Sequence, residues 1–178
     1  MTNTEIDVFM FDAEEKFNTL IEKFFETIGF SVDCSIGLNF AYYPLSKEIT
    51  YPLIDNTPKE ANDAYKVFCK KQFNFDIDTY CNIFTFSLLH ELGHYITFDT
   101  ISKKKMRKIR KAKKYMSNYV CRKQSDFFDK QYVYCSLLDE KLATQTAINL
   151  ILENQELIIA FENILSDMFT EFYFHIEF

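Results

Sequence analysis

Two of the three histidines in this chain lie in the short segment His90-Glu91-Leu92-Gly93-His94. In a helix, residues four apart project from the same face, about 6 Å apart along the axis. Two imidazole nitrogens with this spacing can bind one Zn²⁺ ion at ~2.0–2.1 Å each. Glu91 is one step around the helix from His90, where its carboxylate can reach a water molecule. The segment therefore predicts a catalytic zinc site with His90 and His94 as ligands and Glu91 as general base.

This pattern is rare by chance. The histidine and glutamate content of the chain gives on the order of 0.004 expected matches. The alternative is a coincidental pair of helix histidines, one of them a hydrogen-bonded core residue. A catalytic zinc needs three protein ligands and a water molecule, so a third ligand must come from elsewhere. The downstream side chains that could serve are Asp139, Glu140, Glu153, Glu156, Glu162 and His175.

Among these candidates, Glu140 has the most suitable neighbours. On a helix, Glu140, Ala143 and Ala147 share one face. Alanines beside a carboxylate let that helix approach another closely, and Gly93 offers a complementary flat position between the two histidines. Pairing of Gly93 with Ala143 would bring Glu140 to the metal. The alternative is that Glu140 is a surface residue beside ordinary core alanines.

The composition predicts one helix-rich domain spanning residues 1–178. A chain of this length, 48% hydrophobic and 17% aromatic, can bury a core, and only 3 Gly and 3 Pro argue for long regular elements. The five cysteines are scattered without a C-x-x-C pair, which is typical of free thiols in a reducing compartment. The acidic N-terminal segment does not resemble a signal peptide, and no run of 18 apolar residues occurs. We therefore expect a soluble, cytoplasmic protein with no membrane partner.

The net charge of −6 is unevenly distributed along the chain. Residues 103–114 hold nine of the 20 basic residues and no acidic one, which leaves 26 acidic against 11 basic residues elsewhere, a net charge of −15. An acidic protein with one basic segment is not expected to bind nucleic acid directly. The basic segment is either a solvated helix face or a docking element, which would bind an acidic partner, meet a DNA-bound substrate or cover the site.

Hydrophobic periodicity places the motif within a series of helices with two strands before it. The strands, 38–43 and 48–54, are expected as a hairpin or as neighbours, and Pro52 would confine the second to an edge or an end. The motif helix is apolar on nearly every side and is expected to be buried, with Asp76 or Asp78 as its cap. Residues 169–178 fit either a terminal strand or a continuing helix. The expected helices are 5–28, 58–73, 79–97, 129–152 and 155–170, together with a cationic helix that contains the basic segment. That helix carries a thin apolar stripe of Met106, Ile109, Ala112 or Lys113, Met116 and Val120.

The segment HELGHY followed by E-x-x-A-x-x-x-A at 140–147 resembles the gluzincin-type zinc peptidases, and most of all the ImmA/IrrE family of metallopeptidases. The resemblance covers about residues 38–152. It implies His90, His94 and Glu140 as zinc ligands and Glu91 as base. It also implies a predominantly helical α+β, zincin-like domain whose small antiparallel or mixed sheet precedes the motif helix and holds an extended substrate along its edge strand. The chain departs from the family pattern at Thr144, where relatives usually carry Asp or Asn.

These observations favour a zinc metalloendopeptidase that cleaves a specific intracellular protein. By resemblance the substrate is a helix-turn-helix repressor of a phage or mobile element. The alternatives are a zinc-bearing protein that binds a partner without cleaving it, or an anti-restriction factor, since the same two motifs resemble a domain of plasmid anti-restriction proteins. The oligomeric state stays open. The candidates for stabilising the reaction's oxyanion, which sequence does not rank, are Tyr115, Tyr119, Tyr132, Tyr134 and His175.

Overall fold

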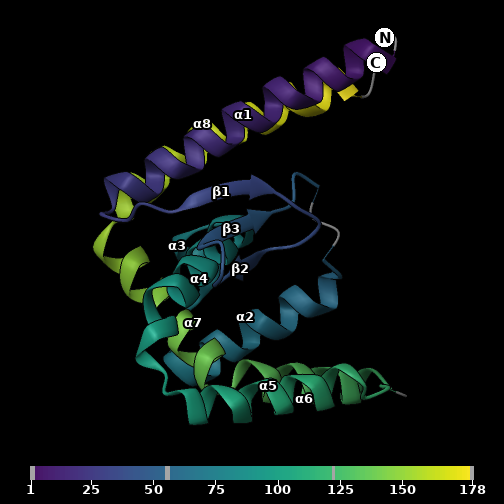
Figure 1. Cartoon of the computed structure of the whole chain (residues 1–178), viewed down its shortest axis with the longest axis vertical. Coiled ribbons are helices and arrows are strands. Elements are labelled where there is room, and N and C mark those ends of the chain that lie inside the picture. The colour runs from purple at the N-terminus through teal and green to yellow at the C-terminus, as the bar shows by residue number, and fades with distance from the viewer. Residues whose placement is uncertain (1–2, 55–56, 122, 177–178) are drawn as a thin grey trace.

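The computed structural model describes residues 3–54, 57–121 and 123–176. Within them the chain is mostly helical, with one small sheet in the middle, as the predicted α+β class requires. Helices α1 (Asn3–Thr27) and α8 (Gln155–Ile176) lie along one edge of the sheet. The other helices lie behind the sheet or beyond its opposite edge (Figure 1).

The sheet has three short strands in the order β1-β3-β2. Strand β2 (Ala41–Tyr43) pairs antiparallel with β3 (Glu48–Tyr51), which confirms the predicted hairpin. Strand β1 (Asp33–Ile36) pairs parallel with β3 and was not predicted, because four residues give too short an alternation to recognise. Strand β1 makes β3 the central strand, so the edge position predicted for the strand over 48–54 is wrong. Pro52 instead lies directly after the end of β3, where its missing N–H costs no ladder bond.

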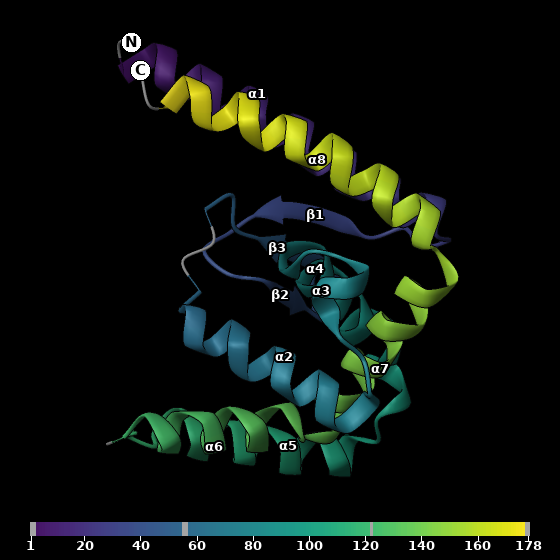
Figure 2. The ribbon, with the colours of Figure 1, turned by 180° about the vertical axis from the view of Figure 1, so that it is seen from behind.

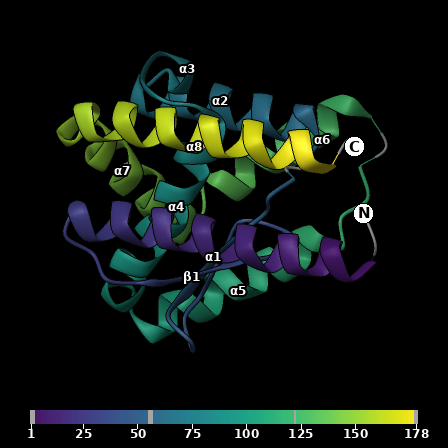
Figure 3. The same ribbon diagram turned by 90° about the horizontal axis from the view of Figure 1, so that it is seen from above.

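Helices α1 and α8 run antiparallel, with both termini at the same end of the molecule (Figure 3). Aromatic side chains join them: Phe24 stacks on Phe161, and Phe17 contacts Phe169. Gly29, with φ +95°, follows the end of α1 as predicted. The C-terminal segment continues the helix through Ile176, which decides between the two alternatives, while residues 177–178 lie outside the described part.

The motif helix is α4 (Ile83–Thr97), and it lies against the sheet and α7 (Leu138–Glu153). It begins later than predicted, because the short helix α3 (Ile77–Tyr80) precedes it. Asn82, not Asp76 or Asp78, is its cap: the Asn82 side chain accepts a hydrogen bond from the Thr85 N–H at 2.8 Å. Asn82 can do this because its backbone is extended, the conformation that a cap requires.

Three further helices lie beyond the β2 edge of the sheet (Figure 2). They are α2 (Lys59–Phe73), the basic helix α5 (Lys103–Ser117) and α6 (Gln124–Cys135). The single helix predicted over 129–152 is wrong, since α6 and α7 are separated at Ser136 and Leu137. The Ser136 hydroxyl donates to the Tyr132 carbonyl at 2.7 Å, and the backbone of Leu137 is extended. In the described part of the chain, no helix combines the length and apolarity needed to cross a bilayer.

Candidate metal centre

Close packing of α4 on α7 brings the two parts of the motif together. Gly93 lies against the backbone of Ala143, which confirms the predicted pairing: a Cβ added at Gly93 would lie 2.8 Å from the Ala143 Cα atom. This contact places the Glu140 carboxylate between the two imidazoles. Glu140 Oε2 is 3.2 Å from His90 Nε2, and Glu140 Oε1 is 3.5 Å from His94 Nε2. Glu140 is buried, so the alternative of a surface glutamate is wrong.

The donor atoms of this cluster fit a divalent metal ion. Ligands at ~2.0–2.1 Å around a tetrahedral zinc are separated by about 3.3 Å, which matches both imidazole–carboxylate distances. The ligand atoms of His90, Glu91 and His94 also lie within 4.8 Å of one another, so this group could hold a metal ion. The same distances suit hydrogen bonds between the imidazoles and Glu140. Metal binding by His90, His94 and Glu140 therefore stays a prediction, now with suitable geometry.

Glu140 and His94 stabilise each other's charged forms although burial disfavours both. Burial alone would raise the pKa of Glu140, but hydrogen bonds from His90 and His94 outweigh it and hold this pKa well below its ordinary value. Burial alone would lower the pKa of His94. The hydrogen bond to Glu140 and the charge of Glu140 outweigh this effect, so the pKa of His94 is raised overall. Glu140 is thus ionised and available as an anionic ligand.

Side chains from α2 and α7 contact the other imidazole nitrogen of His90, Nδ1. The Tyr65 hydroxyl, from α2, lies 2.6 Å from His90 Nδ1 and 2.9 Å from the Thr144 hydroxyl of α7. If His90 binds a metal through Nε2, its Nδ1–H donates to Tyr65, and the Tyr65 hydroxyl then donates to Thr144. Such contacts fix the tautomer and orientation of a metal-binding imidazole. Thr144, the departure from the family pattern, thus takes part in positioning the His90 imidazole.

We expect Tyr65→Phe to weaken zinc binding about tenfold while leaving the fold intact. Loss of the hydroxyl frees the His90 imidazole, although the Thr144 hydroxyl at 3.3 Å from Nδ1 compensates in part. Competition titration with a chromogenic chelator measures the affinity. Tyr115→Phe is the matched control, because that side chain is 74% exposed. Equal zinc affinities for the two variants would show that Tyr65 does not position the ligand.

Glu91 points toward the sheet rather than toward Glu140. Its Oε2 atom accepts a hydrogen bond from the backbone N–H of Tyr42 in β2 at 2.8 Å. This N–H lies on the free edge of β2, because β3 occupies the other edge. The contact holds the predicted base beside the edge strand, among the residues that line the cleft described below.

Lys113 enters the site from the basic helix and was not predicted there. Its ammonium lies 2.6 Å from Asp139 Oδ2, forms an ion pair with Glu140 Oε1 and lies 5.2 Å from the centre of the Tyr134 ring. Burial lowers the pKa of Lys113, but the charge of Glu140 outweighs it and the net shift is upward. The ammonium therefore stays charged. One signal in the sequence could have found it: Lys113 follows Ile109 by four residues and Met106 by seven, so it lies on the thin apolar stripe of the basic helix.

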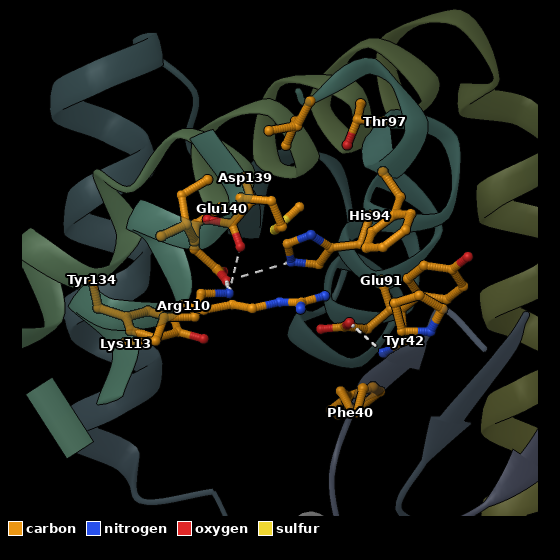
Figure 4. Close-up of a pocket in the computed structure, with 16 residues that line it drawn as sticks. Phe40, Tyr42, Glu91, His94, Thr97, Arg110, Lys113, Tyr134, Asp139 and Glu140 are labelled. Carbon is orange, nitrogen blue, oxygen red and sulfur yellow. Dashed lines mark hydrogen bonds and ion pairs between the residues drawn. The ribbon is translucent and has the colours of Figure 1, made fainter. Parts of the chain in front are cut away.

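These side chains line an open cleft of about 390 Å³ (Figure 4). Phe40 and Tyr42 border it on the sheet side, and Arg110 and Lys113 reach in from α5 (Figure 4). The lining contains three carboxylates but only two side-chain cations, Lys113 and Arg110. In addition, Oδ1 of buried Asp139 has no hydrogen-bond partner among the described residues. The cleft thus has a net deficit of positive charge that a divalent ion would offset. Its acidic residues are Glu91, Asp139 and Glu140.

The other predicted site residues lie elsewhere, with two exceptions, Asp139 and Tyr134. Tyr134 lines the cleft, whereas Tyr115 and Tyr119 line a separate cavity between α5 and α6. Tyr132 accepts a hydrogen bond from Gln72, and the side chain of His175 lies outside the described part. Of the remaining third-ligand candidates, Glu153 and Glu156 are exposed near the junction of α7 and α8, and Glu162 accepts the Asn82 N–H at 2.7 Å.

Comparison of the chain with known proteins gave no match among protein-family models, curated proteins or solved structures. Function therefore has to be inferred from the chemistry of the cleft.

Proposed function

We propose that this protein is a zinc-dependent metalloendopeptidase with a zincin-like domain. The observation that carries the proposal is the approach of Glu140 from α7 to within 3.5 Å of both histidine side chains of α4. Glu91, on the same helix, is fixed beside an edge strand at the mouth of the cleft. A purely structural metal site has no need of such a base next to its ligands.

A zinc ion bound in the cleft would supply Lewis acidity for polarising a peptide carbonyl and lowering the pKa of water toward ~7. His90, His94 and Glu140 would hold it, and Tyr65 keeps the His90 ring in place. Glu91 accepts the proton of the attacking water and later delivers it to the leaving amine. Its hydrogen bond to the Tyr42 N–H orients the carboxylate for both steps.

The edge strand β2 suits an extended peptide as substrate. Phe40, Ala41 and Tyr42 line the cleft, and β2 has no partner strand on this edge. A substrate strand could therefore pair with the backbone groups of this edge other than the Tyr42 N–H, which Glu91 occupies. Together with the family resemblance, this supports an intracellular protein as substrate, and a helix-turn-helix repressor is the specific candidate. Incubation of the zinc-loaded chain with a random peptide library, with and without a chelator, tests the activity. We expect cleavage that the chelator abolishes.

Tyr134 is the described tyrosine best placed to stabilise the oxyanion. Burial and the charge of Glu140 raise the pKa of its phenol, so it stays protonated and can donate. We expect Tyr134→Phe to lower kcat about 10²-fold with little change in KM or zinc content. Tyr132→Phe, two residues earlier on the same helix and more exposed, is the matched control. An unchanged kcat in Tyr134→Phe would exclude this role.

A second candidate function is a partner-binding protein without proteolysis. It is favoured by Lys113, whose ammonium pairs with the Glu140 oxygen nearest His94 and could hold the site together without a metal. The two candidates differ in zinc content and in the effect of the chelator. A chain that binds no zinc and cleaves no peptide, yet captures a partner, would support the second.

A further inference from the structure

A second open cavity, of about 420 Å³, adjoins the metal-centre cleft. The two cavities share Phe98, Ile101, Met106 and Arg110 in their linings, so they form one continuous depression between the end of α4 and helix α5. We call the part away from the metal centre the α5 groove. Its lining comprises Phe98, Asp99, Ile101, Lys103, Met106, Arg107 and Arg110.

The α5 groove combines an apolar floor with a cationic rim. Lys103, Arg107 and Arg110 are spaced i, i+4, i+7, which puts them on one face of α5. All three are exposed, and among the described residues no acidic side chain lies within ion-pair distance of any of them. Asp99 is the acidic residue in the lining, so the groove has an excess of positive charge.

We propose that the α5 groove binds an acidic segment of the protein substrate, a few residues from the bond that is cleaved. Apolar side chains of the segment contact the floor, and its Asp or Glu side chains pair with the rim cations. This inference rests on the proposed peptidase function, because it takes the occupant to be part of the chain whose scissile bond lies in the adjoining cleft. It assigns a substrate preference to α5, which the resemblance to known peptidases does not supply.

Charge complementarity favours an acidic peptide over a nucleic acid. Outside residues 103–114 the chain carries a net charge of −15, which repels a polyanion as long as a nucleic acid. A short acidic peptide segment meets only the local cations. The floor of Phe98, Ile101 and Met106 also suits side chains rather than a phosphate backbone.

The test uses Glu91→Gln, which is expected to bind substrate without cleaving it. Fluorescein-labelled peptides share one apolar pattern and carry Glu, Gln or Lys at the intervening positions, and anisotropy gives their Kd values. We expect the Glu peptides to bind about tenfold more tightly than the Gln peptides, and the Lys peptides more weakly still. Equal affinities across the series would overturn the proposal, whatever the variants below do.

A matched pair of triple variants locates the site. The first variant changes Lys103, Arg107 and Arg110 to Gln. The second changes Lys104, Lys108 and Lys111 to Gln. These three lysines are each one residue further along the same helix and lie outside both cavity linings. We expect about a tenfold loss of affinity for the Glu peptides in the first and less than a twofold change in the second. Equal losses in both would mean general attraction to the basic helix and would overturn the α5 groove as the site.

Two further outcomes separate the inference from its alternatives. If an oligonucleotide displaces the Glu peptide, and if its own binding is lost only in the first variant, the α5 groove binds nucleic acid. That result would contradict the proposal. Cleavage of the same peptides by the unaltered zinc-loaded chain is scored separately. Preferential binding of the Glu peptides without cleavage would support the α5 groove as an acidic-peptide site and contradict the peptidase function. Cleavage without any preference for the Glu peptides would support the peptidase function and contradict the α5 groove as that site.

Discussion

Replacing Glu91 with glutamine is expected to lower peptide cleavage at least about 10³-fold while one zinc ion stays bound per chain. The amide cannot accept the proton of the attacking water, so the chemical step is lost. Its oxygen can still accept the hydrogen bond from the Tyr42 N–H, so α4 and β2 keep their contact. Elemental analysis of the purified variant and a peptide-cleavage assay measure the two quantities together.

His94→Ala is the companion variant, and it should lose both metal and activity. It removes one of the two imidazoles near Glu140 and leaves too few ligands for tight binding. The contrast between the variants separates a catalytic base from a metal ligand. Cleavage by Glu91→Gln at the rate of the unaltered chain would falsify the mechanism.

Gly93→Ala should destabilise the protein by about 3 kcal/mol, which lowers Tm by about 10 °C for a chain of this size. The new Cβ would lie 2.8 Å from the Cα atom and 2.9 Å from the carbonyl carbon of Ala143. Both are helix backbone atoms, so no side chain can rotate away and α4 and α7 must separate. Alanine is a better helix former than glycine by up to about 1 kcal/mol, which offsets only part of the clash. Separation also moves Glu140 away from the histidines, so zinc affinity should fall as well.

Gly29→Ala provides the matched control for this substitution. Gly29 has φ +95°, so alanine there is strained, but nothing lies within 4 Å of the added Cβ. We expect a loss of about 1 kcal/mol with unchanged zinc affinity. Thermal denaturation and chelator competition on both variants check the comparison. A Gly93→Ala protein with the Tm and zinc affinity of the unaltered chain would mean that the close packing of α4 and α7 does not position Glu140.

The parts of the site that depend on regular helix geometry were predictable from sequence. The i, i+4 spacing put His90 and His94 on one face of a helix, and the small side chains at Gly93 and Ala143 indicated which helix packs against it. The physical basis is local: helix periodicity and side-chain volume are properties of the sequence itself. The hairpin of β2 and β3 was found for the same reason, since alternation and turn residues are short-range signals.

The contacts that depend on tertiary placement were not predictable. Tyr65 lies 25 residues before His90, on a helix whose face toward the site no local pattern specifies. Lys113 shares the thin apolar stripe of the basic helix with Met106 and Ile109, but only the packing of α5 decides that this stripe meets Asp139 and Glu140. Strand β1 and the break between α6 and α7 were missed because both are decided by two to four residues.

X-ray absorption spectroscopy of the chain loaded with one equivalent of zinc identifies the atoms that bind the ion. For a centre built from His90, His94 and Glu140 we expect a four-coordinate ion with imidazole nitrogens at ~2.0–2.1 Å and carboxylate or water oxygens at ~2.0–2.2 Å. We also expect Glu140→Ala to lose the ion. All five cysteines are free, so thiolate coordination is a real alternative. Sulfur scattering at ~2.3 Å, or an ion retained in full by Glu140→Ala, would contradict a centre built from His90, His94 and Glu140.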